Sequence, residues 1–216
     1  MARFEKVAAS GEPASLARVV ERAVEVLCAQ GIVAHPTDTV YGIGGACTPD
    51  VDSRVAALKG RGVEGSQLLR IAADATAIRS FFPDLEWNTW AEVLADMFWP
   101  GPLTLVLDDG TGTGVAVRVE GHAVLGSVLR AWGAPISSTS LNRAGESPAV
   151  TSVEAKRNLD RMPDAGIQIL LIDAGELPGP PPSTLVSLAG SEPVVLREGA
   201  LSAESILDCV RGIPRS

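Results

Sequence analysis

The chain contains 216 residues, of which 46% are hydrophobic and 20% charged, and its formal net charge is −8. This composition excludes an intrinsically disordered chain, and the length allows one large domain with a sizeable core. The acidic balance disfavours a protein whose main task is to wrap nucleic acid, because neutralising phosphates requires a basic surface.

The N-terminal segment carries Glu5 and lacks the apolar core of a secretory signal, and no apolar run is long enough to span a bilayer. We therefore expect a cytoplasmic protein that does not enter a membrane.

Apolar residues recur at helical spacing over 15–30, with Ser15 as the candidate N-cap and Gly31 as the residue that ends the helix. Similar patterns predict helices at 51–60, 74–82, 89–99, 122–132, 152–159 and 202–210, and strands at 32–35, 68–73, 103–109, 115–119, 134–140, 167–175, 183–188 and 193–198.

The order of these elements predicts the fold class. Strands 103–109 and 115–119 are adjacent in the chain, as are 184–188 and 193–197, so each pair favours antiparallel pairing. The other strands are separated by helices, which favours a mixed sheet with helices packed on it. We expect an α/β (α+β) protein with a twisted sheet. No internal repeat or domain linker appears, so residues 1–216 are expected to form a single domain.

Familiar nucleotide and metal motifs are absent from the sequence. There is no GxxxxGK[ST] phosphate loop, and the run from Gly42 fails the GxGxxG pattern because Cys47 occupies the place of the third glycine. No GxSxG nucleophile elbow is present. His35 and His122 are the only histidines and no CxxC pair occurs, so we expect no structural metal site.

Four polar patches stand at predicted strand ends or in turns, where α/β proteins commonly bind ligands. They are Pro36–Thr39, Lys59–Arg61, Arg118 and 137–145. A lysine and an arginine in one turn can together bind a polyphosphate, the lysine as a mobile charge and the arginine as a bidentate fork.

Within the last patch, Ser138, Ser140 and Asn142 alternate, so in an extended segment they face the same way and suit hydrogen bonding to phosphate or ribose. Each patch also has a purely structural interpretation. A Lys-Gly-Arg turn is more often a solvated loop, serine and threonine clusters often form turns or caps, and Arg118 could pair with Asp108 or Glu120. Taken one at a time, the structural interpretations are favoured.

Taken together, the motifs point to one family. In chain order they read "PTDTVYGIG", "KGR", "WPGPLTLVL", "VAVRV", "SSTSLNRAGESPA", "STLVSL" and "VLREGAL". This series resembles the Sua5/YrdC/YciO family from about residue 15 to residue 205, in its single-domain form without a separate C-terminal Sua5 domain. The Lys-x-Arg and Ser-x-Asn pairs and "WPGPLT" are its most specific parts.

The resemblance implies a YrdC-like twisted sheet around a concave, positively charged cavity. It also implies the activity of an L-threonylcarbamoyladenylate synthase, a nucleotidyltransferase that forms threonylcarbamoyl-AMP and pyrophosphate from L-threonine, bicarbonate or carbon dioxide, and ATP with Mg2+. The product serves the t6A modification of adenosine 37 in tRNA. The tRNA threonylcarbamoyl-transfer complex is an implied partner, and weak RNA binding is possible within the family.

The family's functional residues carry over onto matching positions. The resemblance implies that Lys59 and Arg61 are catalytic and bind the triphosphate, that Ser138, Ser140, Asn142 and Arg197 complete the ATP site, and that Thr37, Arg118 and Ser183 bind threonine. No covalent intermediate is required, so catalysis would consist of positioning and charge neutralisation.

Several supporting positions depart from the family pattern. Gly62 follows the Lys-x-Arg motif in place of proline, Glu120 also replaces a proline, and Gly114 stands where threonine or serine is common. Leu141 replaces alanine in Ser-Ala-Asn, and Ala144 replaces the next serine. If Leu141 points into the cavity, it crowds the nucleotide.

These departures keep other interpretations open. The chain could be a divergent transferase of the same fold that uses another amine or carbamoyl substrate. It could also be a non-catalytic RNA-binding module, which the net charge of −8 disfavours. A plain globular domain with unrelated polar patches is the least favoured, because the motifs occur in the family's order.

Overall fold

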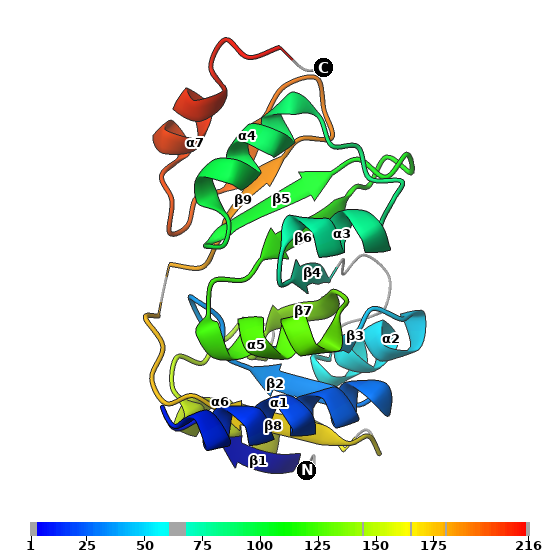
Figure 1. The fold of residues 1–216 in the computed structure, drawn as a ribbon, viewed down its shortest axis with the longest axis vertical. Coiled ribbons are helices and arrows are strands. Elements are labelled where there is room, and N and C mark those ends of the chain that lie inside the picture. Colours follow the sequence, from blue (N-terminus) through cyan, green and yellow to red (C-terminus); the bar gives the residue numbers. More distant parts are fainter. Residues whose placement is uncertain (1–3, 61–67, 144, 165, 180, 215–216) are drawn as a thin grey trace.

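The computed structural model describes residues 4–60, 68–143, 145–164, 166–179 and 181–214. Over these residues, ten strands form one mixed sheet that is flanked by seven helices (Figure 1). The elements are β1 (Phe4–Ala8), α1 (Pro13–Cys28), β2 (Ile32–His35), β3 (Gly42–Ala46), α2 (Pro49–Leu58), β4 (Leu69–Ala72), α3 (Ala75–Phe81), α4 (Thr89–Phe98), β5 (Leu103–Leu107), β6 (Val115–Val119), α5 (Ala123–Trp132), β7 (Ile136–Ser140), α6 (Ser152–Asp160), β8 (Ile169–Asp173), β9 (Thr184–Ser187), β10 (Val194–Arg197) and α7 (Ala203–Val210).

The strands follow the order β1-β8-β2-β3-β7-β4-β6-β5-β9-β10 across the sheet. Both antiparallel pairs expected from the sequence are confirmed, β5 with β6 and β9 with β10. The pairs β2–β3, β3–β7 and β4–β7 are also antiparallel, whereas β1–β8, β2–β8, β4–β6 and β5–β9 are parallel. The expected α/β class with a mixed sheet is therefore confirmed.

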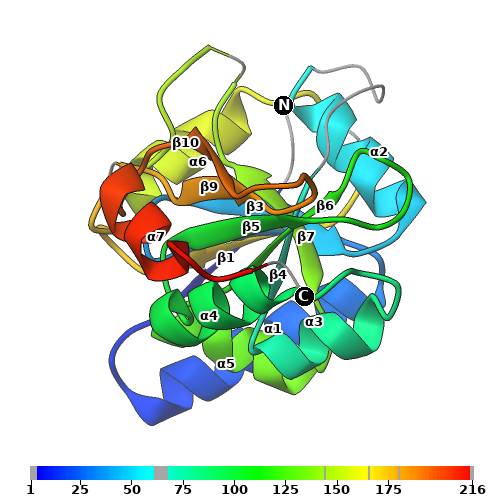
Figure 2. The same cartoon turned by 90° about the horizontal axis from the view of Figure 1, so that it is seen from above.

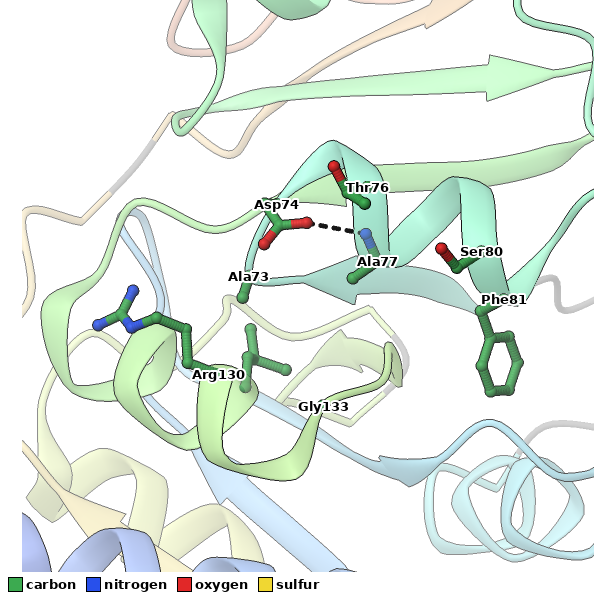
Figure 3. A pocket seen from close by; sticks show the side chains of 9 residues that line it. Ala73, Asp74, Thr76, Ala77, Ser80, Phe81, Arg130 and Gly133 are labelled. Carbon is green, nitrogen blue, oxygen red and sulfur yellow. Dashed lines mark hydrogen bonds between the residues drawn. The ribbon is translucent and has the colours of Figure 1, made fainter.

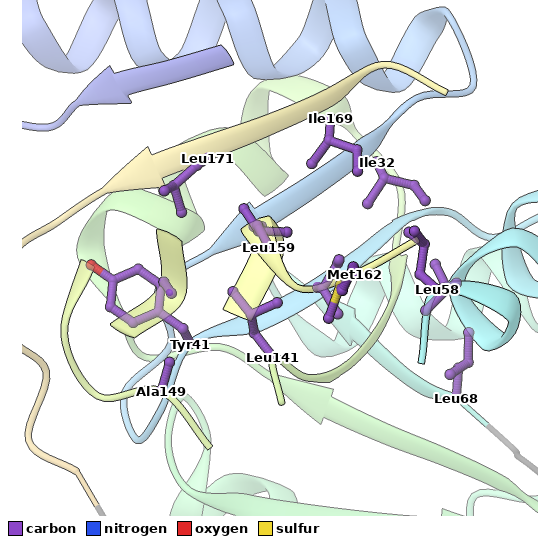
Figure 4. Packing of buried hydrophobic residues seen from close by; sticks show 14 of the residues in the cluster. Ile32, Tyr41, Leu58, Leu68, Leu141, Ala149, Leu159, Met162, Ile169 and Leu171 are labelled. Atoms are coloured by element: carbon purple, nitrogen blue, oxygen red, sulfur yellow. The ribbon is translucent and has the colours of Figure 1, made fainter. Parts of the chain in front are cut away.

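Three buried apolar clusters hold the helices on this sheet. One cluster joins α1 and α5 to β2, β4, β7 and β8, and a second joins α2 and α6 to β2, β3 and β8 (Figure 4). The third joins α3, α4 and α7 to β5, β6 and β9. Figure 2 shows α1, α3, α4 and α5 on one side of the molecule and α2 and α6 on the other.

Two of the strands, β1 and β3, were not predicted from the sequence. The glycine run of β3 suggests a flexible turn, but it forms a fully buried strand between β2 and β7. Its glycines are required by close packing rather than by a ligand loop. A Cβ atom on Gly44 would lie 1.7 Å from the backbone carbonyl oxygen of Ser137. Glycine inside a strand commonly marks such a close approach.

We predict that Gly44→Ala lowers the free energy of unfolding by about 2 kcal/mol or more, because the backbone of β7 must move to accept the methyl group. Gly11→Ala is the matched control, since no atom lies within 4 Å of a Cβ built there. Urea unfolding of both variants measures the difference. Equal stability of the two variants would contradict the assigned role of Gly44.

Candidate functional site

A cavity of about 370 Å³ lies on one face of the middle of the sheet. Its lining comes from the loop after β2, from strands β3, β4, β5, β6, β7, β9 and β10, and from the segments that precede α6 and β9. The lining combines hydroxyl and apolar side chains in similar number with two arginines and one glycine: Thr37, Thr39, Val40, Tyr41, Gly42, Leu69, Ile71, Thr104, Ala116, Arg118, Ser138, Thr139, Ser140, Pro148, Pro182, Ser183, Leu185 and Arg197.

Lys59 reaches the edge of this cavity from the end of α2. The helix begins at the Thr48 cap, whose hydroxyl accepts from the Val51 amide, and ends with Lys59 as the C-cap. The Lys59 ammonium donates to the Ser140 carbonyl oxygen at 2.5 Å and to Asn142 Oδ1 at 3.1 Å. The side chain is thereby buried and directed at the end of β7, where its ammonium could form a charge-assisted hydrogen bond with a phosphate oxygen.

Ser140, Leu141 and Asn142 form the corner that receives Lys59. The Ser140 hydroxyl donates to Asn142 Oδ1 at 2.6 Å. Leu141 is fully buried in the cluster beneath α6, together with Tyr41 and Leu159 (Figure 4). Leu141 therefore points away from the cavity, and its replacement of alanine does not crowd a ligand.

Thr37 closes the turn that follows β2. Its hydroxyl donates to the Val40 carbonyl oxygen at 2.6 Å and accepts from the backbone amides of Thr39 and Val40, each at 3.1 Å. This hydrogen bonding fixes the turn and places the Thr37 side chain at the cavity wall.

Arg118 lies at the same end of the cavity, within a buried charge cluster. Its guanidinium forms an ion pair with Asp38 and lies 3.8 Å from Glu120 Oε2, while Nε donates to the Gly101 carbonyl oxygen. Of the two partners that the sequence suggested for Arg118, Glu120 is therefore present. Burial lowers the pKa of Arg118, and the charge on Glu120 opposes that shift. Two carboxylates, Asp38 and Glu120, thus balance this one arginine. A ligand carboxylate would have to compete with them for the guanidinium.

The remaining wall is formed by Ser183 and Arg197. The Ser183 hydroxyl lies 2.9 Å from the Thr104 hydroxyl, and Arg197 donates to the Ser183 carbonyl oxygen at 2.9 Å. Burial lowers the pKa of Arg197. Thr104 was not singled out from the sequence, although a hydroxyl within the apolar run of β5 was a usable signal.

The residues expected at the site mostly converge. The cavity is lined by Thr37, Arg118, Ser138, Ser140, Ser183 and Arg197, and Lys59 and Asn142 join it through Ser140. Arg61, Gly62 and Ala144 lie outside the described residues. Gly114 adopts a φ of 70° at the start of β6 and is not among the lining residues.

His35 contacts the lining residue Ser138, and the family motifs did not assign it a role. It is fully buried at the end of β2, and its Nε2 lies 3.2 Å from the Ser138 hydroxyl. Burial lowers its pKa from the ordinary 6.5 to about 4, so the ring is neutral near pH 7. The signal in the sequence was a histidine placed directly before the polar turn.

A second cavity, of about 390 Å³, lies between α3 and α5 (Figure 3). Asp74 lines it but accepts from the Ala77 amide at 2.8 Å as the cap of α3. Arg130 lines it but donates to Ser127 on its own helix. Its two charged groups are therefore already used locally, and we assign the functional site to the cavity over the sheet.

The comparisons with known proteins agree with this geometry. The model of Sua5, YciO and YrdC proteins, described as "Telomere recombination", matches residues 25–199. This match covers most of the chain. The chain belongs to the Sua5/YciO/YrdC family.

A family member from Stenotrophomonas maltophilia, named threonylcarbamoyl-AMP synthase, is 36% identical over 180 residues, which are 76% of this chain and 91% of that protein. A relative from Halorhodospira halophila with the same name is 35% identical over 158 residues, 68% of this chain and 80% of that protein.

Solved structures of the family share the fold. P. abyssi Sua5 complexed with L-threonine has a TM-score of 0.78 and 27% identity, covering 98% of this chain and 62% of that one. The chain thus spans less than two thirds of that Sua5. E. coli YciO has a TM-score of 0.78 at 22% identity, covering 96% of this chain and all of YciO. Among the described residues, no helix is long and apolar enough to cross a membrane.

We predict that His35 makes the protein less stable in acid. Its folded pKa of about 4 lies below the ordinary 6.5, so the unfolded chain binds a proton that the folded chain refuses. The corresponding stability is full above the unfolded value and is lost as the pH falls from about 6.5 to about 4, by up to about 3 kcal/mol. Urea unfolding across this range should show a steeper loss in the native protein than in His35→Phe. Parallel curves would contradict the assigned pKa.

Proposed function

We propose that this protein is a threonylcarbamoyl-AMP synthase that converts L-threonine, bicarbonate or carbon dioxide, and ATP into threonylcarbamoyl-AMP and pyrophosphate. The observation that carries the proposal is the joining of two kinds of group in one cavity. Lys59, held in place by Ser140 and Asn142, offers a cationic hydrogen-bond donor for phosphate, while Thr37 and Arg118 offer an amino-acid site. The names of several relatives and the threonine-bound Sua5 structure support it.

The reaction requires no protein nucleophile. The threonine amine attacks carbon dioxide and loses a proton, which gives a carbamate. A carbamate oxygen then attacks the α-phosphorus of ATP, and pyrophosphate leaves with the bonding electrons. Lys59 and Arg61 would neutralise charge on the phosphates, and the cavity walls would hold the two reactants in line.

Mg2+ would enter with ATP, whose phosphates it neutralises and orients. Within the described ranges, no group of three or more His, Cys, Asp or Glu side chains could hold a metal ion. Asp38 is already paired with Arg118. The residues therefore fit a metal held by the phosphates and water rather than by a dedicated protein site.

The product would supply the t6A modification of tRNA through the threonylcarbamoyl-transfer complex.

A divergent transferase that accepts another amine is the second candidate. Leu141 and Gly114 do not favour this candidate, because neither residue lines the cavity. Glu120 does favour it, since this buried carboxylate competes for Arg118. Substrate assays therefore decide between the two.

The direct test of function is pyrophosphate release from ATP with bicarbonate and Mg2+, with and without L-threonine, followed by mass spectrometry. We expect threonine-dependent release and the mass of threonylcarbamoyl-AMP. Release only with another amine would support the divergent transferase. Salt-sensitive RNA binding without any turnover would favour the binding module instead.

We predict that Lys59→Ala lowers kcat/KM by about 100-fold or more while the fold is retained, because one cation is removed from the transition state. Arg61→Ala is expected to act similarly. Lys156→Ala is the matched control, since Lys156 is exposed and pairs with Asp160 on α6. Steady-state kinetics measure all three variants. Near-native activity of Lys59→Ala would refute the phosphate assignment.

Arg118→Lys is expected to raise the threonine KM by about tenfold and leave the ATP KM within about twofold, because lysine keeps the charge but loses the bidentate fork. Arg118→Ala should raise the threonine KM further. It should also destabilise the fold, because Asp38 and Glu120 lose their cation. Equal increases in both KM values for Arg118→Lys would count against a threonine-binding role.

A further inference from the structure

The hydrogen bond between His35 and Ser138 spans three strands. His35 on β2 is paired with Gly42 on β3, and Gly44 on β3 is paired with Ser138 on β7. The imidazole therefore passes over β3 to reach Ser138. A Cβ on Gly42 would lie 2.5 Å from His35 Cε1 and 2.9 Å from Ser138 Oγ, so the contact exists only because residue 42 has no side chain.

The two partners of the ring determine which nitrogen carries the proton. His35 Nδ1 lies 3.3 Å from the Pro36 carbonyl oxygen, which can only accept a hydrogen bond. A neutral imidazole has one N–H, so the proton is assigned to Nδ1 and Nε2 is left as an acceptor. Ser138 must then donate its only hydroxyl proton to Nε2, across 3.2 Å.

We propose that His35 is a positioning residue that fixes the Ser138 hydroxyl as a hydrogen-bond acceptor toward the cavity, so that Ser138 recognises an N–H or O–H of the ligand. The proposal rests on the function proposed above. It excludes a phosphate or carboxylate oxygen as the partner of Ser138, because such oxygens need a donor. Ser138 is thereby distinguished from Lys59, which can only donate.

The position of Ser138 limits the ligand groups that can reach it. Along β7 it stands two residues before Ser140, next to the Lys59 ammonium. Ile71 on β4 pairs with Arg118 on β6 and with Ile136 on β7. Ser138 therefore stands two residues along β7 from the position level with Arg118. A ligand with phosphates at Lys59 and an amino acid at Arg118 passes over Ser138. Two donors fit this place, the amine N–H of the amino acid and a ribose hydroxyl of the nucleotide.

The tautomer can be tested without any assay of activity. The chain contains two histidines, so 15N-histidine labelling gives two ring systems, and the His35→Gln variant assigns them. Long-range 1H–15N spectra near pH 7 are expected to report the proton of His35 on Nδ1. A proton on Nε2, or on both nitrogens, would overturn the proposal, because Ser138 would then be free to donate into the cavity. This result stands even if the protein proves not to make threonylcarbamoyl-AMP.

A double-mutant cycle tests the coupling of the two residues. His35→Phe and Ser138→Ala are each expected to lower kcat/KM by about tenfold, as for the loss of one hydrogen bond. The double variant should be no worse than Ser138→Ala, and His35→Gln should recover part of the loss through its amide oxygen. Additive losses would contradict the proposal. Ser137→Ala is the matched control, since this hydroxyl bonds to the Gly45 carbonyl oxygen and does not line the cavity.

The kinetics of Ser138→Ala separate the two donors. A higher threonine KM with an unchanged ATP KM identifies the amine. A higher ATP KM identifies the ribose, and in that case 2′-deoxy-ATP or 3′-deoxy-ATP should be weakened in the native protein but not in Ser138→Ala. Unchanged KM values and unchanged kcat in Ser138→Ala would overturn the assigned contact.

Discussion

The absence of side chains at Gly42 and Gly44 of β3 is the constraint on which the cavity depends. Gly44 lets β7 approach so closely that any Cβ would meet the backbone of Ser137. Gly42 leaves the space through which His35 reaches Ser138. This strand joins the two halves of the sheet, so the same glycines that permit its packing also bring the loop after β2 to the hydroxyl-rich end of β7. A side chain on Gly42 would occupy the space between His35 and Ser138, and one on Gly44 would force the backbone of β7 to move.

The charge of the cavity differs from that of the whole chain. The protein has a net charge of −8, yet Lys59, Arg118 and Arg197 gather around one concave face. Arg118 is paired with Asp38 and Glu120, and the Lys59 ammonium donates to oxygens of Ser140 and Asn142.

Much of this arrangement could be predicted from the sequence, since the helices, most strands and both adjacent hairpins follow apolar periodicity. The order of the motifs also predicted which polar residues meet, because strand ends that carry them lie on neighbouring strands. The strand β3 could not be predicted, since glycine has low strand propensity and its packing depends on β7, about 90 residues later. The direction of Leu141 was likewise undetermined, because only tertiary packing under α6 decides it.

A crystal structure with L-threonine and a non-hydrolysable ATP analogue would show whether the cavity over β7, β4 and β6 holds both substrates. We expect phosphate oxygens beside Lys59, the threonine near Thr37 and Arg118, and a ligand N–H or O–H facing Ser138. Nucleotide bound instead between α3 and α5, near Asp74 and Arg130, would contradict it.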